Sequence, residues 1–83
     1  MVRLTFFGRL TDLTDSAPRE IDLPPGVGDV AALRAWLSDK DAHLADALAA
    51  PGVRAVVDDA IVADTHRISQ AREIGFIPPV SGG

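Results

Sequence analysis

Two strand-like segments at opposite ends of the chain constrain the fold most. Residues 2–7 alternate in the period of two that is typical of a half-buried strand, and residues 73–77 form a second apolar strand-like run. Between them, Val30, Leu33 and Leu37 recur at spacings of three and four residues, which predicts the apolar face of one main helix. Because 83 residues can build only one modest core, we expect both strands and this helix to share it.

Shorter elements complete the expected fold. Further strands are expected over residues 19–23, 53–57 and 61–62, a short helix over residues 42–49, a helix N-cap at Asp29 and a turn at Asp58-Asp59. The order of strand, strand, helix and several strands predicts an α+β fold of the β-grasp type, with a mixed sheet packed on one main helix. Its first and last strands would be adjacent in the middle of the sheet. A ferredoxin-like sandwich is the main alternative, but it needs a second full helix before its last strand, and residues 65–72 are too polar and short for one.

Beyond the last strand the chain reads Pro78-Pro79-Val80-Ser81-Gly82-Gly83. The two prolines stiffen the exit from the domain, and glycine lets a backbone approach another molecule closely. We therefore expect a domain over residues 1–77 and an extended, flexible tail over residues 78–83, which can reach about 20 Å. Such a tail can carry the Gly83 carboxylate through a narrow channel into another protein's active site.

Composition and size disfavour several classes of protein. With a net charge of −4 and scattered Lys and Arg, we expect no nucleic-acid partner. The apolar runs are too short to span a membrane and the N-terminus lacks a leader pattern, so we expect a cytoplasmic protein without a membrane partner. The absence of cysteine removes thiol nucleophiles, and one small domain leaves no cleft between lobes, so an enzyme acting alone is disfavoured.

Two sequence features resemble parts of cofactor sites, but neither is complete. We therefore expect this chain to bind no cofactor. Residues 26–31 fit a G-x-G-x-x-A loop, but Pro24 and Pro25 intervene after the strand and no βαβ unit follows. His43 and His66 have no companion ligand pattern, so we expect surface histidines and no metal site.

The closing segment, residues 73–83, resembles the C-terminal motif of the small subunits of molybdopterin synthase, a family of ubiquitin-like sulfur carriers. The resemblance continues through residues 4–10, 30–37 and 55–58, which are similar to that family's first strand and turn, its helix, and the strand before its acidic or amide turn. The Pro-Pro-Val-Ser-Gly-Gly ending is the specific part, because related carriers share Gly-Gly but not usually the proline pair. Asp58 stands where the family often has asparagine, and Ala71-Arg72 where it usually has Gly-Asp.

The resemblance implies a two-stage chemistry at Gly83. A separate adenylating enzyme would use ATP and Mg to convert the terminal carboxylate, a poor electrophile, into an acyl-adenylate, and sulfur from a donor would then replace AMP to give a thiocarboxylate. In this family the large synthase subunit holds cyclic pyranopterin monophosphate and accepts two sulfurs from two carriers, during molybdenum cofactor biosynthesis. The implied assembly is a heterotetramer of two small and two large subunits, in which this chain is a non-catalytic carrier that binds no cofactor itself.

Docking to a partner requires an apolar surface. Phe7, Ile61 and Ile77 are expected to share the exposed side of the sheet near the tail, and the family's interface uses matching positions. The alternative is that these three residues belong to the core.

Other destinations for an activated Gly-Gly end stay open. A ubiquitin-like protein modifier would join Gly83 to a target lysine by an amide bond, and a carrier for thiazole or cysteine biosynthesis would give its sulfur to another acceptor. All three need the same adenylation. The proline pair and the apolar surface favour the carrier for molybdopterin.

Overall fold

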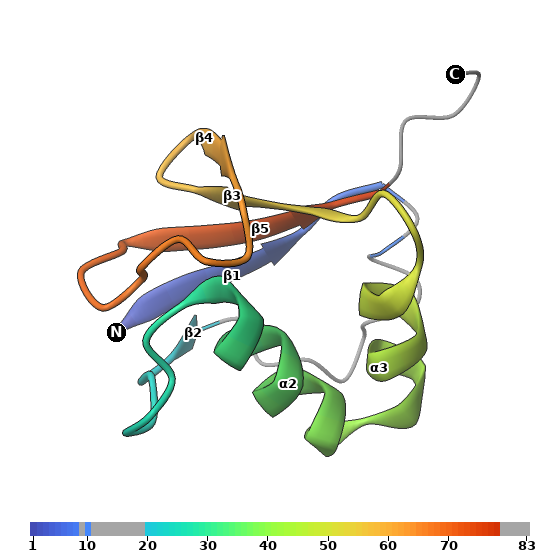
Figure 1. The fold of residues 1–83 in the computed structure, drawn as a ribbon, viewed down its shortest axis with the longest axis horizontal. Helices are drawn as coiled ribbons and strands as arrows, with labels where there is room; N and C mark the ends of the chain where they lie inside the picture. Colours follow the sequence, from blue (N-terminus) through green and yellow to red (C-terminus); the bar gives the residue numbers. More distant parts are fainter. Residues whose placement is uncertain (9, 11–19, 79–83) are drawn as a thin grey trace.

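The computed structural model describes residues 1–8, 10 and 20–78. Its elements are β1 (Val2–Phe6), β2 (Glu20–Ile21), α2 (Val30–Lys40), α3 (Ala42–Ala49), β3 (Arg54–Val57), β4 (Ala60–Val62) and β5 (Glu73–Ile77). Figure 1 shows two layers, with the sheet above and both helices on the same side of it. In the described part of the chain, no helix is long and apolar enough to cross a membrane.

The sheet has the strand order β2-β1-β5-β3-β4. Strands β1 and β5 are parallel, with Leu4 opposite Ile74, whereas the other neighbouring pairs are antiparallel. The first and last strands therefore lie side by side inside a mixed sheet, which confirms the predicted β-grasp (Figure 1). The ferredoxin-like alternative is wrong, because residues 63–72 form turns and no helix.

Element boundaries differ slightly from the expected ones. Strand β2 keeps only Glu20–Ile21 among the described residues, and β3 begins one residue late because Val53 donates its amide to Ala50 in a turn. Strand β4 begins one residue early. Asp58 and Asp59 both have positive φ, at 47° and 73°, so the predicted turn is a tight two-residue hairpin that brings Ala60 opposite Val57.

The core lies between the inner face of the sheet and the helices. Helix α2 begins at the predicted N-cap, where the Asp29 side chain accepts from the Ala32 amide at 2.8 Å. The three residues predicted for its apolar face, Val30, Leu33 and Leu37, are buried. Ile68, in the loop between β4 and β5, is also fully buried although the sequence pattern gave no sign of it. This loop therefore closes the core over the N-terminal end of α2.

Candidate tail exit and docking surface

On the face of the sheet turned away from the helices, the strand register places residues of neighbouring strands opposite one another in rows across the sheet. The row nearest the end of β5 holds Phe7, Ile77 and Arg54, and the next holds Thr5, Gly75, Val56 and Ile61. Phe7 follows β1 and continues its ladder, since its amide donates to the Phe76 carbonyl at 3.1 Å. Four of these side chains, from Phe7, Val56, Ile61 and Ile77, form what we call the apolar patch.

The structure places all three predicted interface residues in this patch. Phe7 is 44% exposed and Ile61 is 60% exposed, whereas Ile77 is half-buried. None of the three belongs to the buried core, so the alternative that they are core residues is wrong. Val56 was missed, although its place between the buried Ala55 and Val57 indicates an outward side chain. Whether a partner binds this patch stays a prediction.

The Phe7 ring lies across Gly75 of the neighbouring strand. A Cβ atom built on Gly75 would be 2.7 Å from Cε2 of Phe7 and 3.5 Å from Cδ2. The ring therefore occupies the space that a side chain at position 75 would fill. Gly75 is buried as a result, although it lies on the outer face of the sheet.

A tight turn borders the point where the chain leaves β5. Gly8 has a φ of +57°, in the left-handed region that favours glycine, and a Cβ there would lie 3.0 Å from Cγ of Pro78. Pro78 is thus packed against the turn that follows β1. The other predicted tail residues, Pro79, Val80, Ser81, Gly82 and Gly83, lie outside the described residues.

Asp58 holds the opposite end of β5. Its Oδ1 accepts from the amides of Arg72 at 3.0 Å and Glu73 at 2.9 Å, and its own amide donates to the Glu73 carbonyl at 3.0 Å. An asparagine has the same Oδ1 acceptor, so either residue at position 58 can accept from these two amides. Ala71 likewise donates to the Ile68 carbonyl at 3.0 Å, so the turn before β5 forms without the Gly-Asp pair.

Arg34 of α2 joins three parts of the fold. Its guanidinium donates to the carbonyls of Leu48 at 2.9 Å and Val53 at 2.8 Å, and its Nε pairs with Asp64 at 3.0 Å. Its Cζ atom also lies 5.2 Å from the centre of the Phe76 ring. Leu48 is in the last turn of α3, where carbonyls lack partners within the helix. Arg34 therefore fixes α3 and the start of β3 against the strand that leads to the tail.

The glycine loop before α2 faces a helix end whose amides already have partners. Besides the N-cap bond, Val30 donates to the His66 carbonyl at 3.2 Å and Ala31 to the Asp64 carbonyl at 2.9 Å. An anion could bind these amides only by displacing the loop between β4 and β5. His43 and His66 are both exposed, and no group of three potential metal ligands occurs among the residues that the structure describes.

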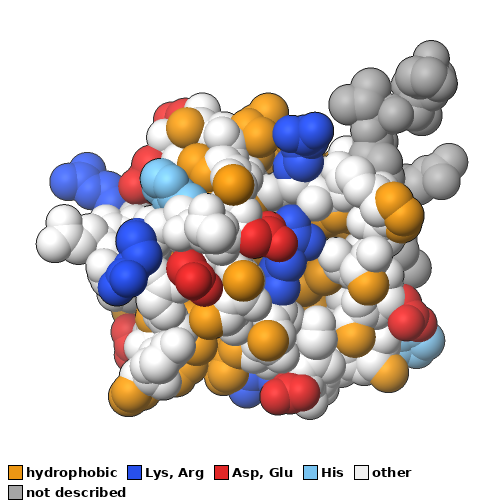
Figure 2. Space-filling view, viewed as in Figure 1, with side chains coloured by type: hydrophobic (Ala, Val, Ile, Leu, Met, Phe, Trp, Pro, Cys, Tyr) orange, Lys and Arg blue, Asp and Glu red, His pale blue; other side chains and the backbone are white. Residues whose placement is uncertain are grey.

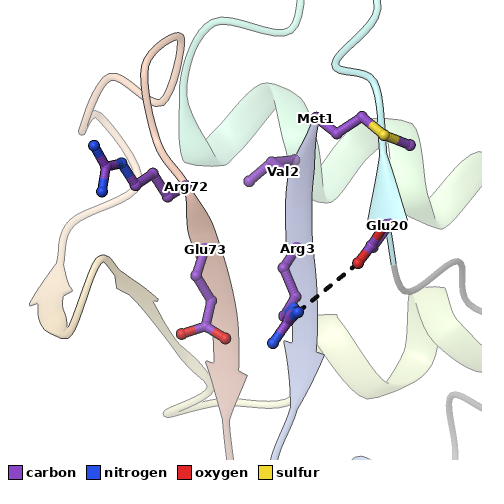
Figure 3. Close-up of a pocket in the computed structure, with 6 residues that line it drawn as sticks. All are labelled: Met1, Val2, Arg3, Glu20, Arg72 and Glu73. Carbon is purple, nitrogen blue, oxygen red and sulfur yellow. Dashed lines mark ion pairs between the residues drawn. The ribbon is translucent and has the colours of Figure 1, made fainter.

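Charged side chains are dispersed over the surface. On the face drawn in Figure 2, Lys and Arg are interspersed with Asp and Glu. An open hollow at the start of β1 and β5, far along the sheet from Pro78, is shown in Figure 3; it is lined by Met1, Val2, Arg3, Glu20, Arg72 and Glu73. Arg3 and Glu20 form an exposed ion pair there at 3.9 Å, while Arg72 points away from them (Figure 3). Exposed pairs of this kind contribute little to stability.

Comparison with known proteins agrees with this arrangement. A sequence model described as the ThiS family matches residues 4–83. The molybdopterin synthase sulfur carrier subunit of Escherichia coli (strain K12) is 31% identical over 85 residues, covering 100% of both chains.

Proposed function

We propose, from the premise that this chain belongs to the ThiS family and is a sulfur carrier of that type, that it is the small subunit of a molybdopterin synthase. One observation carries the proposal. The central strand β5 ends beside an exposed apolar patch, and the sequence then continues through the proline pair to Gly83. A patch beside the base of a narrow tail suits a protein that docks on a partner and delivers its terminus into that partner's active site.

The chemistry begins at the Gly83 carboxylate. An oxygen of this carboxylate attacks the α-phosphorus of ATP in a separate Mg-dependent enzyme, releasing pyrophosphate and forming an acyl-adenylate. Hydrogen sulfide released from the sulfur donor then attacks the carbonyl carbon, AMP leaves with the C–O bond electrons, and loss of the S–H proton gives the thiocarboxylate. The resulting thiocarboxylate is the sulfur nucleophile that the tail carries. This chain contributes the reacting terminus, and its partners contribute the cofactors and the general bases.

The acceptor step would take place in the large subunit. There, the thiocarboxylate sulfur bonds to a side-chain carbon of cyclic pyranopterin monophosphate as the oxygen on that carbon leaves with the C–O bond electrons, and hydrolysis of the thioester to Gly83 leaves the sulfur on the pterin and restores the carboxylate. Two carriers supply the two sulfurs of the dithiolene, which fits a heterotetramer of two small and two large subunits. The apolar patch would bury its side chains against the large subunit and so fix where the tail enters.

The experiment is a reconstitution with purified components. The full chain is incubated with an adenylating enzyme, ATP, Mg and a sulfur donor, and mass spectrometry is expected to show one oxygen exchanged for sulfur at Gly83. The thiocarboxylated chain is then mixed with a large subunit and cyclic pyranopterin monophosphate, and we expect molybdopterin to form. The unsulfurated chain is the matched control.

Other products would overturn the proposal in identifiable ways. A lysine-linked adduct in place of a free thiocarboxylate would indicate a protein modifier. Sulfur transfer to a thiazole or cysteine precursor, with none to the pterin, would indicate a carrier for those pathways. The expected cytoplasmic location is part of the same proposal, and cell fractionation tests it.

A further inference from the structure

We propose that Gly75 is a positioning residue for partner binding, because its lack of a side chain leaves room for the Cε2 edge of the Phe7 ring. The inference rests on the proposed function for the identity of the partner. The position of the ring itself rests only on the geometry of this chain.

The backbone gives glycine no advantage at position 75. Gly75 is inside the central strand β5, opposite Thr5 on one side and Val56 on the other. Its φ lies outside the left-handed region, so any residue could adopt this backbone conformation. Glycine inside a strand is also unfavourable, because it loses more conformational entropy on folding and has no side chain to pack. The reason for glycine here must therefore be steric.

The steric reason is the Phe7 ring. The Cβ position on Gly75 is 2.7 Å from Cε2 of Phe7, whereas the nearest backbone atom, the Thr5 carbonyl oxygen, is at an ordinary 3.5 Å. Of the three atoms nearest to a Cβ at position 75, the two ring carbons of Phe7 and the Thr5 carbonyl oxygen, only Cε2 of the ring is close enough to clash. Phe7 is 44% exposed and lies outside the buried core, so its ring can move outward into solvent without opening the core.

Moving the ring changes the shape of the apolar patch. In the structure, the Cε2 edge of the ring occupies the space beside Gly75, and the exposed part of Phe7 is available to a partner together with Ile61 and Ile77. A methyl or isopropyl group at position 75 would push the ring away from its present position, and a partner surface shaped for that position would fit the displaced ring less well. Substitution at Gly75 should therefore weaken docking while the domain stays folded. The occupant that this geometry fits is an apolar surface of the large subunit that packs on the exposed part of the Phe7 ring.

The test is a double-mutant cycle with the large subunit. Gly75→Val and Gly75→Ala are made in the wild-type chain and in Phe7→Ala, and the Kd of each is measured by calorimetry, with the unfolding midpoint recorded for every variant. In the wild-type chain, Gly75→Val is expected to raise Kd about tenfold or more, the scale of one lost apolar anchor. In the Phe7→Ala chain, Gly75→Val is expected to change Kd by less than about twofold, because no ring is left to displace. Gly75→Ala serves as the smaller change should valine prevent folding.

NMR supplies a reading that does not depend on any partner. In the wild-type chain, NOEs are expected between the Phe7 ring protons and the Gly75 α-protons, and in Gly75→Ala the pattern should shift as the ring is displaced. Absence of these NOEs in the wild type would overturn the inference directly. Equal losses of affinity with and without Phe7, or an unchanged Kd in a folded Gly75→Val, would also overturn it. If the wild-type chain binds no large subunit while the NOEs are present, the proposed function fails and the ring geometry stands.

Discussion

Replacing Arg34 with methionine removes the contacts that join α2, α3 and β3 while keeping a long, flexible apolar side chain. Two carbonyls, those of Leu48 and Val53, lose donors at 2.9 and 2.8 Å. Hydrogen bonds to a charged group contribute about 1.5–3 kcal/mol each. The ion pair with Asp64, whose side chain is 55% exposed, adds at most about 1 kcal/mol. Because both carbonyl contacts are only partly buried, each is taken at about 1.5–2 kcal/mol, and with the ion pair we expect Arg34→Met to lower the free energy of unfolding by about 3–5 kcal/mol.

The loss should be easy to measure in a domain of this size. For domains of 60–100 residues, 1 kcal/mol corresponds to about 4–8 °C, so the unfolding midpoint is expected to fall by at least about 12 °C. Trp36 is the only tryptophan and is half-buried, so its fluorescence can follow unfolding in urea or on heating. Arg34→Lys keeps the charge but cannot reach all three acceptors, and it should fall between the wild type and Arg34→Met.

Arg54 provides the matched control. Its exposed side chain makes no ion pair with the described residues, so Arg54→Met should change stability by no more than about 0.5 kcal/mol. Asp64→Asn removes only the charge and should also cost little. A loss below about 1 kcal/mol for Arg34→Met, or a loss matched by Asp64→Asn, would refute the argument that the two carbonyl contacts dominate.

Four further predictions concern the tail, the patch, the hairpin and nucleotide binding. Deleting Gly83 should abolish sulfur transfer in the reconstitution and leave the unfolding midpoint unchanged; normal transfer would contradict a role for the tail. Phe7→Asp should weaken association with the large subunit, because docking would bury an unpaired charge, whereas Lys40→Ala on α2 should not; equal binding by a folded Phe7→Asp would show that the patch is misplaced. Asp58→Ala should cost about 1–3 kcal/mol in urea unfolding by leaving two amides without their acceptor, while Asp58→Asn should cost less. Calorimetry of the isolated chain with ATP is expected to show no binding, because the first amides of α2 have partners inside the protein; micromolar affinity would contradict this.

Much of the fold follows from local patterns that are legible in the sequence. The spacing of Val30, Leu33 and Leu37 predicted the buried face of α2, and Asp29 marked its start. The positions of the first and last strands followed from alternation and from β-grasp topology, and their parallel pairing is observed. These features were accessible because each depends on residues close together in the chain, or on one rule that relates whole elements.

Contacts between distant segments were not accessible in this way. Ile68 is isolated among polar residues, so periodicity gave no reason to place it in the core. The role of Arg34 in joining α2, α3 and β3 could not be predicted from the sequence. Its acceptors are backbone carbonyls, which every residue has, so no sequence pattern identifies them. The acceptor role of Asp58 likewise depends on where β5 begins relative to the hairpin.

By itself, the sequence determined the periodic elements and the Gly-Gly terminus, and it predicted the three apolar residues that the structure places near the end of β5. Only the tertiary structure showed that the Phe7 ring occupies the space beside Gly75 and that Pro78 packs on Gly8. The physical reason is that the steric fit between side chains on a sheet depends on strand order, on register and on how far each side chain projects from the sheet. The sequence does not distinguish a glycine that only weakens a strand from one that makes room for a neighbouring side chain. The position of that neighbour in the tertiary structure does.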